Sequence, residues 1–179
     1  MECGSVTTTP PGIVLKRHLY LDDRRWPIWA RRGVLTLVAL FVLAALADQF
    51  GQGTEVTKAS GVRGTLTVAS PARVRGGLMF TSRFTIQART ALAHPQLVLD
   101  AGWLAGMQIN SIVPQPKDET SVGGRAVFTF AALPRGGRQD YFIGFQADPT
   151  TLGRQLQTVS LRDGNTTLLT VHRTLTVLP

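Results

Sequence analysis

The side chains that could carry chemistry are few and scattered along the sequence. His94 precedes a proline in a turn signal, and His172 lies in a segment of alternating apolar and polar residues. No carboxylate stands at a spacing from either histidine that suggests a shared metal site. The acidic residues to consider as catalytic groups or calcium ligands fall in or beside predicted turns, where Asp commonly bonds its own backbone: Asp100, Asp118, Glu119, Asp140, Asp148 and Asp163.

Motifs that would carry catalysis or cofactor binding are missing from the sequence. It has no Asp-x-Asp-x-Asp ladder for calcium, no Gly-x-Ser-x-Gly elbow and no phosphate-binding glycine loop. The glycine pairs at 123–124 and 136–137 are instead typical of hairpin turns with positive φ. We therefore predict no catalytic, metal-binding or cofactor-binding residues, no small-molecule ligand, and a protein that is not an enzyme.

Charge and cysteine content narrow the function classes further. The chain of 179 residues carries 19 Lys+Arg against 11 Asp+Glu, a formal net charge of +8. Beyond residue 48 the basic residues are spread singly, with no Lys/Arg run and no interleaved aromatic residues, so nucleic acid is not the predicted partner. Cys3 is the single cysteine, so no disulfide can form within the chain and an outer domain must be held by its hydrophobic core.

The strongest local signal is an uncharged run of Leu, Val and Ala from Gly33 to Ala47. At about 1.5 Å per residue this run covers about 22 Å, and extension to Phe50 brings it to about 27 Å. The hydrocarbon core of a bilayer is about 30 Å thick, so we expect a transmembrane helix over residues 33–50.

Residues before this run indicate how the helix is oriented. Basic residues gather on its N-terminal side, which predicts a cytoplasmic tail at residues 1–32 and a C-terminal domain outside the plasma membrane. Trp26, Trp29, Arg31 and Arg32 are predicted to lie at the membrane interface, where indole rings favour the headgroup level and arginines extend toward water.

The same run has a second interpretation. Ala45-Leu46-Ala47 followed by Asp48 fits the small-x-small pattern of a cleaved secretory signal. The basic leader at residues 1–32 is far longer than a usual n-region, which favours retention as an anchor. Cleavage after Ala47 stays open as the alternative.

After an expected linker at residues 51–63, the segment 64–179 has strand character. Between Leu78 and Arg89 apolar residues alternate with polar ones, and Ser82 alone breaks the apolar face. Further strands are predicted at residues 65–68, 96–100, 107–113, 125–131, 140–147, 156–161 and 167–177, separated by Pro, Gly, Asp and Asn. This spacing predicts an all-β fold, an antiparallel β-sandwich, with these residues in its core: Phe84, Ile86, Phe128, Phe130, Ile143 and Phe145.

Two features stand out from the strand pattern. Trp103, Leu104 and Met107 lie in a glycine-flanked apolar stretch, which suggests either an exposed loop that docks on a partner or lipid, or a core tryptophan that closes one end of the sandwich. Arg173 is in phase with the inward residues of its strand. We expect a β-bulge to turn it outward rather than a buried charge.

One longer stretch resembles a known family. From Leu133 the chain reads Leu-Pro-Arg-Gly-Gly, continues as an alternating strand to Asp148-Pro149, and reaches a closing strand that ends near Asp163-Gly164. This pattern resembles the bacterial cell-surface Ig-like domains, loosely over residues 64–179 and closely only in that stretch. The resemblance implies an Ig-like sandwich that serves as a spacer or interaction module rather than one that performs chemistry.

Three functions follow as hypotheses. The first is an accessory or scaffold protein whose anchor lies in the lipid bilayer and whose Ig-like domain binds a neighbouring integral membrane protein. The second is a secreted or wall-binding surface module released by cleavage after Ala47. The third is a membrane-tethered hydrolase, which would need a polar pocket with converging titratable groups.

Overall fold

The computed structural model describes residues 26–46 and 53–179, which fall in two units that we describe separately. The first contains α1 (Trp26–Leu46), a helix whose segment Ile28–Leu46 has a mean hydropathy of 1.7 and is long and apolar enough to cross a membrane. At about 1.5 Å per residue α1 spans about 31 Å. The helix begins seven residues before Gly33, the predicted start of the transmembrane segment. Pro27 lies in its first turn, a position where a helix tolerates proline. Residues 47–50 of the predicted helix lie outside the described residues.

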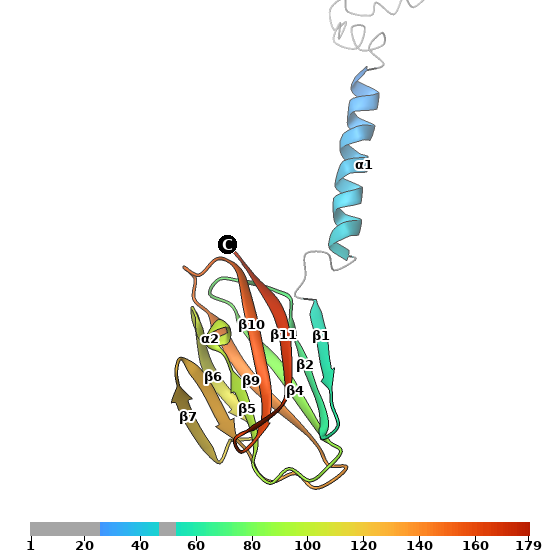
Figure 1. Ribbon diagram of the computed structural model, residues 1–179. Helices are drawn as coiled ribbons and strands as arrows, with labels where there is room; N and C mark the ends of the chain where they lie inside the picture. The colour runs from blue at the N-terminus through green and yellow to red at the C-terminus, as the bar shows by residue number, and fades with distance from the viewer. Residues whose placement is uncertain (1–25, 47–52) are drawn as a thin grey trace, which may run out of the picture. The chain divides into compact units, whose positions relative to one another are not determined.

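The second unit is a β-sandwich of two sheets, as the strand spacing predicted (Figure 1). The five-stranded sheet has the order β1 (Thr54–Ser60), β2 (Gly64–Pro71), β4 (Met79–Ala88), β9 (Arg138–Ala147) and β6 (Met107–Val113). The six-stranded sheet has the order β3 (Arg73–Arg75), β11 (Thr166–Leu178), β10 (Gly153–Asp163), β5 (Pro95–Leu99), β8 (Arg125–Thr129) and β7 (Asp118–Val122). Neighbouring strands are antiparallel except β3 and β11, which are parallel.

Alternating side chains of the two sheets meet in one core. Strand β4 alternates buried and exposed residues along its whole length, and β9 does so from Tyr141 onward. All six predicted core residues are buried. Ser82, the polar break in the apolar face of β4, is fully buried because its hydroxyl forms a 2.7 Å hydrogen bond with that of Ser70 on β2.

The predicted linker at residues 51–63 is wrong in part, because it contains β1. This strand pairs with β2 from Thr54↔Pro71 to Ser60↔Thr65 and also lies beside β11 at the edge of the sandwich. β1 could not be predicted from its residue types, since most of its side chains are exposed and it lacks an apolar alternation. The short strand β3 and the fully exposed strand β7 escaped prediction for the same reason.

Candidate functional site

The face of the five-stranded sheet that points away from the core is a candidate binding surface of the sandwich. No other element of the described sandwich covers it, and many of its side chains are exposed. We call it the outer sheet face and define it by these residues: Val56, Lys58, Thr65, Thr67, Ala69, Met79, Thr81, Arg83, Thr85, Gln87, Val113, Arg138, Asp140 and Phe142.

Strand register brings these residues into rows that cross the sheet. One row runs from Lys58 through Thr67 and Thr85 to Asp140. The row beside it joins Ser60, Thr65, Gln87 and Arg138 across the same four strands. Cross-strand neighbours on one face lie about 4.5–5.5 Å apart at Cβ, so residues distant in sequence form one continuous surface.

A shallow polar depression of about 180 Å³ lies on these neighbouring rows. Its lining residues are Lys58, Thr65, Thr67, Arg83, Thr85, Gln87 and Arg138. The hydroxyl of Thr85 donates a hydrogen bond to Asp140 Oδ1, and Arg138 Nη2 lies 3.9 Å from that same oxygen, too far for a hydrogen bond. The depression is therefore lined by cationic and hydroxyl groups, and the neighbouring carboxylate is already engaged by Thr85.

The next row of the outer sheet face consists of apolar side chains and Arg83. Val56, Ala69, Arg83, Phe142 and Val113 follow one another in register from β1 to β6. Phe142 is 41% exposed and Val113 is 58% exposed, although they are direct cross-strand neighbours. Exposed apolar residues beside cations on a flat surface are typical of protein-binding sites.

The structure overturns the predicted docking loop at residues 103–107. Trp103 is fully buried, and its ring lies 5.3 Å from the rings of both Phe84 and Phe145. Met107 is buried as well, whereas Leu104 is half-buried. The prediction of an exposed contact site is wrong for Trp103 and Met107, because the apolar stretch faces the core rather than solvent.

A short helix places Trp103 in the core. Asp100 is the N-cap residue of α2 (Ala101–Leu104). Its Oδ1 accepts hydrogen bonds from the backbone N–H of Gly102 (3.2 Å) and of Thr158 on β10 (3.0 Å). One carboxylate thus caps α2 and ties it to β10.

Arg173 is also buried, so the prediction that a bulge turns it outward is wrong. Its guanidinium donates to the carbonyl oxygens of Ser70 (3.3 Å) and Pro71 and to Gln157 Oε1 (3.4 Å), and its Cζ lies 5.6 Å from the centre of the Trp103 ring. Burial lowers the pKa of Arg173 and the negative charge of Glu55 opposes that change. The irregularity between β10 and β11 falls at Leu161/Arg162 instead, away from this residue.

A second cavity, of about 370 Å³, lies over a buried aromatic pair. Phe130 and Tyr141 have ring centres 3.9 Å apart and form part of its lining. Burial raises the pKa of Tyr141 to about 12, so this phenol stays protonated at physiological pH. The remaining lining residues are Pro114, Gln115, Lys117, Ala131, Ala132, Leu133 and Gln139, which bring no nucleophile and base together.

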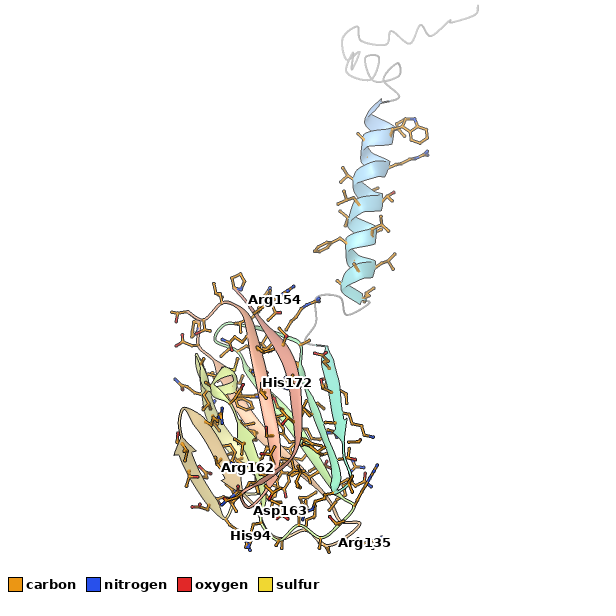
Figure 2. The ribbon with its side chains drawn as sticks, viewed as in Figure 1. His94, Arg135, Arg154, Arg162, Asp163 and His172 are labelled. Carbon is orange, nitrogen blue, oxygen red and sulfur yellow. The ribbon has the colours of Figure 1, made fainter. Side chains whose placement is uncertain are left out.

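The histidines and acids that the sequence brought forward do not form one cluster within the part of the chain that the structure describes. His172 stands on the outer side of β11, where its Nδ1 is 3.2 Å from the Thr158 hydroxyl (Figure 2). The backbone N–H of His94 donates to Asp163 Oδ1 at 2.9 Å, and Arg63 Nη2 lies 2.6 Å from Asp163 Oδ2. Among residues 26–46 and 53–179, no three His, Cys, Asp or Glu residues gather as a metal site.

The predicted membrane-interface residues lie in the first turns of α1. The helix begins at Trp26 and includes Trp29, Arg31 and Arg32. The Arg32 guanidinium lies 5.8 Å from the centre of the Trp29 ring, within the range of a cation–π contact. Their position at a bilayer surface stays a prediction.

Comparisons with known proteins give structural similarity only. No protein-family model matches the sequence, and no curated protein matches it. Among solved structures, the chain is similar to CaCohA2 from Clostridium acetobutylicum (18% identity, TM-score 0.43, 59% of this chain and 85% of that chain). It is also similar to the CARDB domain of the PF1109 protein from Pyrococcus furiosus (10% identity, TM-score 0.41, 70% and 89%). A third is a non-cellulosomal cohesin from Archaeoglobus fulgidus (10% identity, TM-score 0.38, 70% and 91%). The description of the fold as an Ig-like β-sandwich rests on the two sheets themselves.

Proposed function

We propose that this chain is a non-enzymatic, single-pass membrane protein whose Ig-like domain is an accessory or scaffold module that binds a neighbouring integral membrane protein outside the cell. The observation that carries this proposal is the outer sheet face, where Val56, Met79, Val113 and Phe142 are between 41% and 63% exposed. Phe142 and Val113 are cross-strand neighbours, and exposed apolar side chains on an uncovered sheet are stabilised by burial against a partner.

The helix α1 supports the membrane part of the proposal. Its apolar segment is long enough for the hydrocarbon core, and Arg31 and Arg32 stand near its N-terminal end. In this orientation the sandwich emerges on the far side of the plasma membrane, within reach of the outer parts of other membrane proteins.

The arrangement of titratable groups supports a binding role rather than catalysis. Across the described residues, each acid with a lowered pKa has a local structural explanation. Hydrogen bonds from the backbone and side chain of Thr150 lower the pKa of Asp148. Burial would raise the pKa of Asp163, but the hydrogen bond from His94 and the bond and charge of Arg63 together lower it. Neither carboxylate lines one of the two sandwich cavities described above.

Site-specific photocrosslinking in native membranes tests the proposal. The full chain carries p-benzoylphenylalanine in place of Phe142 on the outer sheet face or, as a matched control, in place of Thr174, an exposed residue on the opposite face of the sandwich. We expect one dominant adduct with an integral membrane protein from position 142, and little or none from position 174.

The outcomes separate the proposal from its alternatives. No adduct from position 142, or the same adducts from both positions, contradicts a specific binding face. A mature protein whose mass begins at Asp48 favours the secreted or wall-binding module instead. A hydrolase would be indicated by turnover of ester, amide or glycoside substrates that is lost on substitution of Asp140.

A further inference from the structure

Beyond the existence of a partner, the outer sheet face indicates its chemistry. We infer that the partner presents an acidic segment in which one Asp or Glu carboxylate binds between Lys58, Arg83 and Arg138 while a neighbouring apolar side chain packs on Phe142 and Val113. This inference rests on the proposed function, because it describes the protein that the same face binds.

Charge in the polar depression carries the first part of the inference. Lys58, Arg83 and Arg138 come from three different strands and line one cavity that contains no acidic lining residue. The nearest carboxylate, Asp140, already accepts the hydrogen bond of Thr85 and lies 3.9 Å from Arg138. Within the described residues, Lys58 and Arg83 form no ion pair and Arg138 has only its 3.9 Å contact with Asp140. A carboxylate that enters the depression would form charge-assisted bonds with these cations, which are the strong ones.

Size and polarity restrict what the anion can be. A cavity of about 180 Å³ is below the range of about 300–1,000 Å³ that drug-sized ligands occupy, so it admits a single side chain rather than a whole cofactor. Thr65, Thr67 and Thr85 line the cavity and can donate hydroxyl hydrogen bonds to the oxygens of a carboxylate.

The apolar row supplies the second part. Arg83 pairs in register with Phe142, and Phe142 pairs with Val113, so the cationic depression and the exposed apolar residues are adjacent. An acidic residue that enters the depression would bring the next part of its chain over Phe142 and Val113. Protein interfaces combine an apolar core with a polar rim, and aromatic residues and Arg are enriched in them.

The same features favour a protein over an anionic lipid surface. The exposed apolar residues lie within strands on the flat face of a sheet, rather than on a protruding loop or helix that could enter a headgroup region. The face carries acidic, basic and hydroxyl groups side by side at Asp140, Arg138 and Thr85, a mixture that matches the surface of another protein better than a uniformly anionic headgroup layer.

Charge reversal in the crosslinking protein tests the inference. In the full chain with p-benzoylphenylalanine at position 142, Lys58→Glu and Arg83→Glu together should lower the yield of the adduct at least about tenfold, because two attractions become repulsions. The matched control, Arg73→Glu with Arg75→Glu on β3 of the other sheet, makes the same change in net charge and should leave the yield within about twofold. Circular dichroism of each variant checks that the sandwich stays folded. If the variant with Lys58→Glu and Arg83→Glu does not fold, a variant with Lys58→Gln and Arg138→Gln takes its place.

Sequencing of the crosslinked peptide gives the second readout, and an Asp or Glu close to the attachment point is expected. An adduct whose yield is unchanged by charge reversal, or whose peptide has no acidic residue, overturns the acidic segment but leaves the proposed function standing. An adduct with phospholipid in place of protein overturns the inference and indicates a membrane-docking face. Absence of any adduct from position 142 contradicts the proposed function itself.

Discussion

At the scale of single residues, the core contains a buried arginine. Arg173 is 5% exposed and donates hydrogen bonds to neutral oxygens, and among the described residues its Nε and Gln157 Nε2 have no hydrogen-bond partner. We expect Arg173→Ala to lower the free energy of unfolding by about 2–4 kcal/mol, through lost packing on Trp103 and unpaired carbonyls of β2. Urea unfolding of the detergent-solubilised chain, followed by circular dichroism, measures this.

A double-mutant cycle with Gln157 shows how the effect arises. Gln157→Leu removes the partner amide, so Arg173→Ala with Gln157→Leu should cost less than the sum of the two single substitutions. Strict additivity would show that the 3.4 Å contact between these side chains contributes nothing.

Asp163 is the residue whose contribution depends on pH. Its pKa is lowered in the folded protein by His94 and Arg63 despite partial burial, so its stabilisation is present above the ordinary carboxyl pKa of 3.8 and is lost as the pH falls through the lower folded value. Asp163→Asn should cost about 1 kcal/mol at pH 7, a modest value because Arg63 is partly exposed. Unfolding midpoints of wild type and variant should converge below pH 3.8, and a constant difference across pH would contradict this account.

At the scale of elements, α2 depends on a glycine that allows close approach. A Cβ added to Gly102 would lie 1.9 Å from the carbonyl oxygen of Leu156 on β10. Gly102→Ala should therefore push α2 away from β10, displace Trp103 from its aromatic neighbours and cost about 1–3 kcal/mol. Gly53→Ala is the control, since nothing lies within 4 Å of its added Cβ, and it should leave the urea midpoint unchanged.

Strands differ in how well the sequence predicts them, for a physical reason. β4 and β9 each bury one face, so their period of two was visible in the residue types. β1 and β7 lie at sheet edges and are held mainly by backbone hydrogen bonds, which leave no apolar pattern.

The candidate site was less predictable than the strands. The sequence also places Arg83 and Phe142 on outward faces, but only strand order shows that they are neighbours, so the outer sheet face could not be assembled from sequence. The burial of Trp103 agrees with one of the two interpretations of its sequence, whereas the burial of Arg173 escaped prediction because its hydrogen-bond acceptors are carbonyls of β2, far away in the sequence.

At the scale of the whole molecule, the proposed function requires the two ends of the chain to lie on opposite sides of the membrane. This chain has one cysteine, Cys3, in the predicted basic tail, and its labelling reports on which side of the membrane the tail lies. In intact cells or spheroplasts, a membrane-impermeant maleimide should leave Cys3 unlabelled until the membrane is permeabilised, because short basic flanks stay in the cytoplasm. A Thr174→Cys chain that also carries Cys3→Ser should be labelled at once, since residue 174 is exposed on β11. Labelling of Cys3 in sealed cells, or protection of position 174, would show the opposite orientation of the chain in the membrane. The outer sheet face would then lie on the cytoplasmic side, away from the partner that we propose. Loss of the Cys3 signal altogether, with residue 174 recovered in the medium, would instead show that the leader is cleaved and that the sandwich acts as a released module.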